Sequence, residues 1–200
     1  MTAITSPVME IVATGGTPDL TGSDGVIVTS AHAVRGSLGG RPAYCVGQRT
    51  AEAVRAAGGL VRYQAPDADQ LLRWLAGRDD VGAVIYMRGS HIATDLCGPL
   101  NTAGIPCSEV QTYRQDQLSL SASAIRMLEG EDAAILPLFS ARSARLVGHA
   151  IAQQGPGLHV ITISDAVANA WRDITGGTSE VSAMPTGDAM VDKIVAALRC

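Results

Sequence analysis

The stretch YCVGQRTAEAVRAAG, residues 44–58, joins a short apolar run to a small polar turn and then to an Ala-rich amphipathic segment that ends in Gly. This order is typical of a β-strand that leads directly into an α-helix. The stretch VITISDAVANAWRDITG, residues 160–176, repeats the order, and a weaker pair, residues 26–34 and 135–144, places a Ser at the end of each strand. A doubling at about a hundred residues is far longer than a solenoid repeat. It predicts two similar α/β domains facing one another, with a ligand in the cleft between them.

The whole chain alternates short apolar runs with longer helical patterns, as expected for parallel sheets covered by helices. The predicted strands are 8–12, 26–29, 43–46, 61–64, 83–87, 109–112, 133–139, 160–163 and 180–183. The predicted helices are 31–38, 48–57, 68–76, 91–103, 119–128, 141–153, 164–174 and 187–198. Residues 7–14 and 109–117 mix polar and apolar types without a helical period, and we interpret them as extended crossings between the domains. The predicted boundaries are 13–111 for a continuous domain and 1–12 plus 113–200 for a split domain.

The composition is that of a soluble globular protein and argues against several partners. The 200 residues are 46% hydrophobic and carry a net charge of −4, and only 4% are aromatic. A nucleic-acid surface is not expected, because both a basic excess and stacking aromatic residues are lacking. No apolar run approaches the roughly 20 residues of a membrane helix, and the first residues lack the pattern of a signal peptide. The expected location is therefore the cytoplasm, with no membrane partner.

The cysteines at positions 45, 97, 107 and 200 contain no CxxC pair, and no two histidines have the spacing of metal ligands. The pattern suggests neither a zinc site nor a disulfide framework. We expect structural or incidental thiols and no bound metal.

Small or polar turns follow several predicted strands, at the edge where parallel α/β sheets bind their ligands. Each Ser or Thr in these turns can be a simple helix N-cap, worth about 1 kcal/mol. Several helix N-termini at one edge also favour an anion through their free N–H groups. No Gly-rich nucleotide motif is present. The turns are Thr29–Ser30, Gly47–Thr50, Arg88–Ser90, Phe139–Ser140 and Ser164.

A specific resemblance rests on six segments in order. They read IVTSAHAV (27–34), VGQRTAEAV with AG (46–54 and 57–58), YMRG (86–89), EVQTYR (109–114), LFS (138–140) and ISDAVA (163–168). Together they resemble the uroporphyrinogen-III synthase family from about Pro7 to the C-terminus. Each motif alone is short, and the order and spacing of all six carry the resemblance.

The resemblance implies a cofactor-free lyase of haem and tetrapyrrole biosynthesis. Such an enzyme converts the linear polycarboxylate hydroxymethylbilane into uroporphyrinogen III, with loss of water and inversion of ring D. Ring A loses its hydroxyl group to give an azafulvene, ring D attacks it, and a spiro intermediate fragments and recloses. Much of the rate should come from orientation, because the enzyme must fold a flexible chain.

The resemblance also implies roles for individual residues. Tyr113 is the expected catalytic residue, donating a hydrogen bond or proton to the departing hydroxide. The alternative role of Tyr113 is packing between the domains. The alternative for Arg49 is that it is simply a solvated residue at the start of a helix. Arg88 could bind a carboxylate through two of the three nitrogens of its guanidinium. The expected substrate-binding residues are Thr29, Ser30, Gly47, Gln48, Arg49, Thr50, Arg88, Gly89, Ser140 and Ser164.

The family implies two flavodoxin-like parallel-sheet domains joined by two extended crossings, and this sequence departs from it at the start. The family has a strand and a helix before the segment matched by residues 3–11, and we expect the split domain to lack both. The loss of a central strand in the order 2-1-3-4-5 would open the sheet between the strands of Val8 and Ala133. A late start codon, a natural short form and strand exchange with a partner are the competing explanations.

The expected partner is therefore a small molecule, hydroxymethylbilane, together with a transient contact with hydroxymethylbilane synthase. We expect a monomer unless strand exchange repairs the short N-terminus. A non-catalytic tetrapyrrole- or polyanion-binding or regulatory module with the same fold is the main alternative function. A generic phosphate-binding α/β protein is a third.

Overall fold

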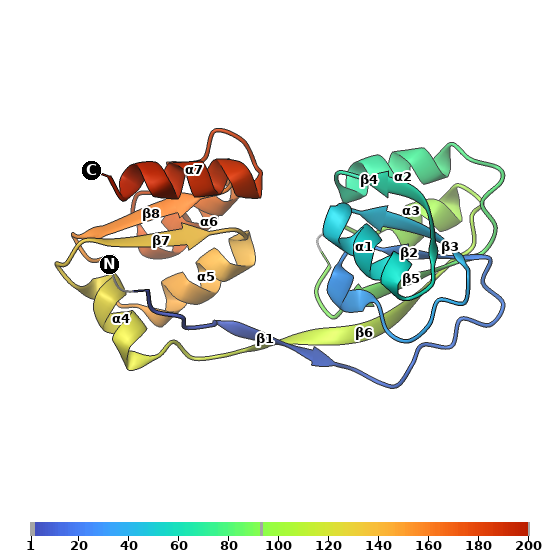
Figure 1. Cartoon of the computed structure of the whole chain (residues 1–200), viewed down its shortest axis with the longest axis horizontal. Helices are drawn as coiled ribbons and strands as arrows, with labels where there is room; N and C mark the ends of the chain where they lie inside the picture. Colours follow the sequence, from blue (N-terminus) through green and yellow to red (C-terminus); the bar gives the residue numbers. More distant parts are fainter. Residues whose placement is uncertain (1–2, 93, 200) are drawn as a thin grey trace. The chain divides into compact units, whose positions relative to one another are not determined.

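The computed structural model describes residues 3–92 and 94–199. The chain divides into a continuous unit, residues 11–116, and a split unit, residues 1–10 with 117–200. The crossings between the units are β1 (Met9–Ala13) and β6 (Cys107–Gln117), which are neighbours in one sheet (Figure 1). The Thr14 N–H donates to the Thr112 carbonyl at 3.0 Å and the Leu118 N–H to the Val8 carbonyl at 2.9 Å, so β1 and β6 run antiparallel.

The sheet of the continuous unit has the strand order β1-β6-β5-β2-β3-β4. Its other strands are β2 (Gly25–Val28), β3 (Pro42–Val46), β4 (Leu60–Ala65) and β5 (Val84–Gly89). The pairs β4–β3, β3–β2, β2–β5 and β5–β6 are all parallel. Counted from β2, the order reads 3-2-1-4-5, which is the doubly wound order with its reversal between β2 and β5 rather than 2-1-3-4-5. This confirms the α/β class and places the switch point of the sheet beside β2.

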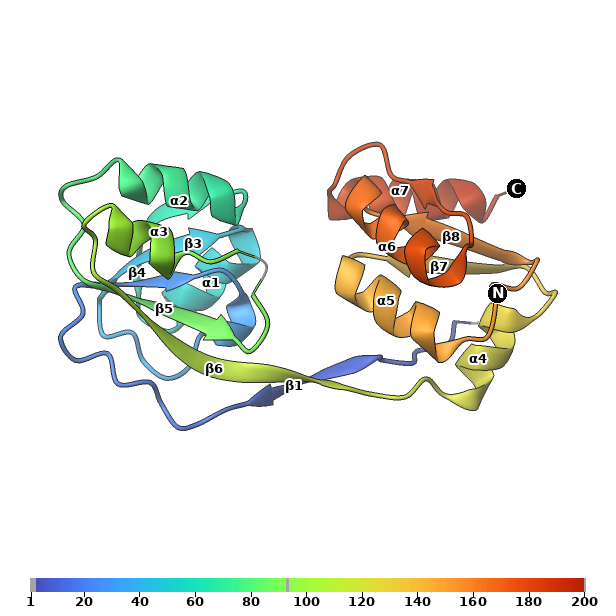
Figure 2. The same cartoon turned by 180° about the vertical axis from the view of Figure 1, so that it is seen from behind.

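Helices cover both faces of this sheet. The helices are α1 (Gln48–Ala56), α2 (Ala68–Ala76) and α3 (Cys97–Thr102). Successive residues of a buried strand point to opposite faces, so Val26 and Val28 pack on the α1 side and Ile27 on the side of α2 and α3. Figure 2 shows α2 and α3 in front of the sheet, whereas α1 is in front in Figure 1. All four residues of β2 are buried, as expected for a central parallel strand.

Two predicted helices of the continuous unit are wrong in extent. In place of 31–38 there is only a 3₁₀ turn, Ala31–Ala33, because Val34 is extended and Gly36 has φ +68°. In place of 91–103, α3 begins at Cys97, where the Asp95 side chain accepts a hydrogen bond from the Gly98 N–H at 3.1 Å. Position 93, within the second prediction, lies outside the described residues. The turns at Ser30 and Ser90 are therefore not followed directly by an α-helix.

The expectation that all cysteines are unpaired is also wrong. Cys97, the first residue of α3, forms a disulfide with Cys107, the first residue of β6. Packing of α3 beside β6 brings them together, because the Asn101 side chain hydrogen-bonds both the N–H and the carbonyl of Cys107. Cys45 is free and fully buried, and burial raises the pKa of its thiol to about 11. Cys200 lies outside the described residues.

The split unit has a smaller parallel sheet with the order β7-β8-β9. Its elements are α4 (Ala122–Glu129), β7 (Ala134–Leu138), α5 (Ala141–Ala150), β8 (Leu158–Thr162), α6 (Asp165–Thr175), β9 (Glu180–Val181) and α7 (Gly187–Ala197). Helices α5 and α6 lie side by side on one face (Figure 2). The core contains Trp171, fully buried, whose indole N–H donates to the Gln154 side chain at 3.0 Å.

The edge strand of this sheet, β7, carries a feature that suits an edge. The Ala134 N–H donates to the Gly157 carbonyl at 3.0 Å, so the N–H of alternate residues faces β8 and the backbone N of Pro137 faces the other side. Proline has no N–H, and it is common on edge strands because it prevents pairing. Val8, which we expected in a strand here, precedes β1 and packs against the core of the split unit.

None of the helices in the described chain combines the length and apolar character needed to cross a membrane.

Candidate active site

The carboxyl ends of β2 and β5 form the switch point of the continuous sheet and carry four predicted site residues. Thr29 and Ser30 follow β2, and Arg88 and Gly89 end β5. The Thr29 hydroxyl is hydrogen-bonded to the Tyr86 hydroxyl at 2.9 Å, which ties the two strand ends together. The Ser30 hydroxyl accepts a bond from the His32 N–H at 3.3 Å and so caps the 3₁₀ turn. Ligands of doubly wound sheets bind at such a switch point.

Tyr86 also belongs to this site, although the sequence alone gave it no predicted role. Its side chain is buried, and burial raises the pKa of its hydroxyl although the Thr29 hydrogen bond acts in the opposite direction. Strand pairing could have found it: Ile27 pairs with Tyr86, and Thr29, just after β2 and two residues beyond Ile27, is expected on the same face of the sheet. The hydroxyl therefore remains protonated and neutral at this sheet edge.

A β-bulge in β6 determines where Tyr113 points. Arg88 pairs with Gln111, but the next residue, Gly89, pairs with Tyr113, so Thr112 is the extra residue of the bulge. The shift turns Tyr113 onto the face of the sheet where Gly89 points. A Cβ atom at Gly89 would lie 2.5 Å from the Tyr113 ring, so the ring occupies the space that a side chain there would need.

Tyr113 is thereby packed into the continuous unit, with 7% of its surface exposed. Its ring centroid lies 6.1 Å from that of His32, which follows Ser30 by two residues. The Ser90 N–H donates to the Tyr113 carbonyl at 2.9 Å and fixes the backbone. Tyr113, Gly89 and the turn after β2 are thus brought together at one sheet edge, on the α1 side.

Arg88 is already engaged by an acid of the next strand. Its Nη2 lies 2.6 Å from Glu109 Oε2, its Nε donates to the same oxygen at 2.6 Å, and its Nη1 donates to the Gly89 carbonyl at 2.9 Å. The Glu109 carboxylate compensates the charge of Arg88. A substrate carboxylate at Arg88 would compete with Glu109. Glu109 lies opposite Tyr86 in β6. It belongs to one of the six sequence motifs, but the motif did not indicate that it pairs with Arg88.

The turn after β3 forms a well-defined helix start. Gly47 has φ +79°, a conformation that L side chains rarely adopt, and α1 begins at the next residue. Gln48 hydrogen-bonds Glu52 at 2.8 Å, and Arg49 is exposed. Thr50 is buried in the first turn of α1. The free N–H groups of this turn point toward the carboxyl edge of the sheet and suit an anion.

The split unit provides two further helix starts, at neighbouring strands. Ser140 caps α5 by accepting a hydrogen bond from the Ser143 N–H at 3.0 Å. Ser164 begins α6 without a side-chain capping bond, so its hydroxyl is not used by the helix. Asp165 is exposed in the first turn, as expected for an acid on the helix surface. The Ile163 N–H donates to the Leu138 carbonyl at 3.1 Å, which holds the two strand ends together.

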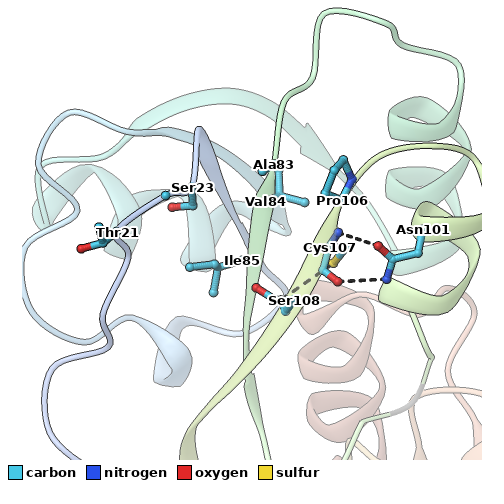
Figure 3. Close-up of a pocket in the computed structure, with 10 residues that line it drawn as sticks. Thr21, Ser23, Ala83, Val84, Ile85, Asn101, Pro106, Cys107 and Ser108 are labelled. Carbon is cyan, nitrogen blue, oxygen red and sulfur yellow. Dashed lines mark hydrogen bonds between the residues drawn. The ribbon is translucent and has the colours of Figure 1, made fainter.

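A cavity of about 210 Å³ lies elsewhere, at the amino ends of β5 and β6 (Figure 3). Figure 3 shows Asn101 turned toward Cys107, with both groups of its amide used by the Cys107 backbone. Ser23 donates to the Leu20 carbonyl at 2.7 Å. These polar lining groups are satisfied within the protein, so the cavity offers a ligand few partners. Among the described residues, no group of three or more His, Cys, Asp or Glu side chains could hold a metal ion.

Comparison with known proteins identifies the family. Residues 1–192 match the family model described as uroporphyrinogen-III synthase HemD. The chain belongs to this family. This match confirms the resemblance of the six sequence segments. Uroporphyrinogen-III synthases are lyases of porphyrin and haem biosynthesis with a small tetrapyrrole substrate.

Solved structures of this family share the fold. Uroporphyrinogen-III synthetase from Helicobacter pylori 26695 matches with a TM-score of 0.71 and 19% identity over 94% of this chain and 90% of that chain. A mutant uroporphyrinogen III synthase from the extremely thermophilic bacterium Thermus thermophilus matches with a TM-score of 0.56 and 16% identity over 96% of this chain and 88% of that chain. No match was found among curated proteins. At these identities the structural likeness establishes the fold.

Proposed function

We propose that this chain is an active uroporphyrinogen-III synthase. It binds hydroxymethylbilane and closes it to uroporphyrinogen III, with inversion of ring D and loss of water, and without a cofactor. The observation that carries the proposal, beside the family match, is that three α-helices start at the carboxyl ends of parallel strands. The first turns of α1, α5 and α6 present N–H groups to anions, and the substrate is a polycarboxylate.

In this proposal the residues divide by task. The backbone around Gly47 and the turns at Ser140 and Ser164 bind carboxylates, and the unused Ser164 hydroxyl adds a donor. Thr29 and Ser30 line the switch point, together with Gly89. These groups hold the flexible substrate in a folded pose, which removes most of the entropic cost of bringing its two ends together. Gln48 and Arg49 extend the binding surface at α1, and Thr50 supports the turn from inside.

Tyr113 is the proposed proton donor to the departing hydroxide. It lies beside Gly89 and His32 at the carboxyl edge, and the bulge at Thr112 fixes its direction. Its burial limits contact with bulk water, which would strengthen a hydrogen bond to a developing negative charge. A Tyr113→Phe variant keeps the packing and removes the donor, so we expect a lower catalytic rate with little change in stability.

The main alternative is a tetrapyrrole- or polyanion-binding module without turnover. Two observations favour it: Arg88 is paired with Glu109, and Tyr113 is largely covered by its neighbours. Under this alternative the same helix starts hold the ligand but no ring closure follows.

A coupled assay separates these functions. Hydroxymethylbilane is generated by its synthase in the presence of the chain, and the products are oxidised and resolved into uroporphyrin III and uroporphyrin I. Predominant type III supports the synthase. Type I alone, which arises from spontaneous closure, rejects it, and retained binding of the linear tetrapyrrole would then support the module.

A pair of serine variants tests the carboxylate-binding turns. Ser164→Ala removes a hydroxyl that does not cap its helix, so we expect a raised KM with unchanged stability. Ser121→Ala is the matched control, because the Ser121 hydroxyl accepts a bond from the Ala124 N–H at 3.2 Å and caps α4. It should cost about 1 kcal/mol of stability and leave KM unchanged. An unchanged KM in Ser164→Ala would remove Ser164 from the binding site.

A further inference from the structure

A second cavity of the continuous unit, about 390 Å³ in volume, lies toward the amino ends of β3 and β4. The candidate active site is at the carboxyl ends of the same sheet, so the two are separate. The volume falls in the range of about 300–1,000 Å³ that is usual for small-molecule sites. The lining residues are Pro42, Tyr44, Arg62, Trp74, Arg78, Asp80 and Val81.

Tyr44 lines this cavity, and its hydroxyl feels the charges of three other lining residues, Asp80, Arg62 and Arg78. Only 7% of the surface of Tyr44 is exposed, and its hydroxyl has no hydrogen-bond partner among the described residues. Burial raises the pKa of this hydroxyl, so it is a neutral donor at physiological pH. The hydroxyl is therefore available to a partner that enters the cavity.

A β-bulge places Arg62 on the same cavity. Ala43 pairs with Val61 and Tyr44 pairs with Tyr63, so Arg62 is the extra residue of β4. Bulges redirect side chains and are frequent beside binding sites. Arg62 makes no ion pair in the described part of the chain, and the Tyr44 hydroxyl feels the charges of Asp80, Arg62, Arg78 and Asp24. The bulge thus brings a guanidinium without an ion-pair partner to the cavity that Tyr44 also lines.

Trp74 forms a rigid apolar wall of the cavity. Its ring stacks on Tyr63 with centroids 4.2 Å apart, and the Arg78 guanidinium carbon lies 4.3 Å from the Trp74 ring centroid. Its indole N–H has no hydrogen-bond partner among the residues described. Arg78 Nε lies 3.5 Å from the exposed Asp80 carboxylate, which leaves the lining with one net positive charge.

We propose that this cavity is a binding site for a small organic carboxylate. The carboxylate accepts hydrogen bonds from the Tyr44 hydroxyl and pairs with the Arg62 guanidinium, and the organic body packs against Pro42, Val81 and the edge of Trp74. Charge-assisted hydrogen bonds of this kind favour a carboxylate over a neutral amide. The site is independent of the proposed synthase activity.

Two-dimensional ¹⁵N NMR of the full chain tests the proposal with benzoate as the probe. The protein has two tryptophans, so two indole N–H signals are expected, and Trp74→Phe assigns them. We expect benzoate to shift the Trp74 signal with saturation, while the Trp171 signal in the other unit stays in place. Benzamide, the neutral analogue, should bind at least tenfold more weakly, as measured on the same Trp74 signal. Equal affinities for both compounds, or no shift with benzoate up to tens of millimolar, would overturn the proposal.

Side-chain variants locate the carboxylate. Tyr44→Phe keeps the ring and removes the hydroxyl, and it should weaken benzoate binding by about tenfold or more, as for other hydrogen bonds to charged groups. Arg62→Gln changes an exposed side chain and should weaken binding several-fold without affecting folding. Arg73→Gln is the matched control: Arg73 is exposed on α2 and does not line the cavity, so binding should be unchanged. Wild-type affinity in both Tyr44→Phe and Arg62→Gln would refute the assignment.

Discussion

Replacing Gly89 by Ala should force Tyr113 out of its position. The added Cβ atom would lie 2.5 Å from Tyr113 Cζ, 2.7 Å from Cε2 and 2.8 Å from the hydroxyl oxygen, where ordinary contact begins at 3.4 Å. Gly89 does not have a positive φ, so the backbone accepts Ala and the whole effect is steric. The ring has to move by nearly an ångström, within a site that leaves it 7% exposed.

Overpacking of this kind costs about 1–3 kcal/mol. Gly89→Ala should therefore destabilise the continuous unit by that amount, and each kcal/mol lowers the melting temperature of a unit of this size by about 4–8 °C. Calorimetry is the suitable assay, because the two units can unfold separately. In the coupled synthase assay the same variant should lose rate if Tyr113 donates the proton, since geometry controls proton transfer.

A control glycine and a double-mutant cycle separate the clash from other effects. Gly16 has open space around its Cβ position and no positive φ, so Gly16→Ala should change stability by less than about 0.5 kcal/mol. In a Tyr113→Ala background the ring is absent, and Gly89→Ala should then cost little. The reasoning is refuted if Gly89→Ala is as stable as Gly16→Ala, or if its cost persists without the Tyr113 ring.

Three further predictions concern the cysteines and one ion pair. Cys97→Ser removes the disulfide to Cys107 and should lower the free energy of unfolding by about 3 kcal/mol, the loop-closure value for so short a loop. Denaturant unfolding with and without reductant measures this difference, and equal stabilities of the wild-type chain and the variant without reductant would contradict it. Cys45, with its raised pKa and full burial, should resist iodoacetamide at pH 8 until the protein unfolds, as read by mass spectrometry. Lys193 lowers the pKa of Glu180, so Lys193→Met should cost up to about 1 kcal/mol above pH 5, and this difference should vanish as the pH falls through the folded-state pKa of Glu180.

The parts of the fold that depend on the hydrophobic pattern were predictable. The continuous apolar run Val26–Val28 forms the central strand, and Gly47 between a strand and an Ala-rich segment marks a helix start. The helix predicted at 31–38 was wrong because Val34 is extended and Gly36 has φ +68°, and the helix predicted at 91–103 was wrong because a local hydrogen bond delays its start. The bond between the Asp95 side chain and the Gly98 N–H sets the start of α3.

The disulfide could not be predicted because it depends on tertiary packing. Cys97 and Cys107 are ten residues apart, with a helix and a turn between them, and no short spacing motif joins them. They meet because the Ile105 N–H donates to the Leu100 carbonyl and Asn101 holds the backbone of Cys107. These bonds turn the chain back from the end of α3 to the start of β6.

The two β-bulges could not be predicted from the sequence either, and each lies beside one of the two proposed sites. Alternation along a strand predicts that Tyr113 shares a face with Gln111 and that Tyr63 shares a face with Val61. One extra residue in each strand, Thr112 or Arg62, reverses every assignment that follows it. Both extra residues stand where a proposed ligand group is presented, at the carboxyl edge for one and toward the amino edge for the other. Strict alternation therefore does not hold at the positions where the side chains of both proposed sites are arranged for binding, and the register of neighbouring strands is needed to place them.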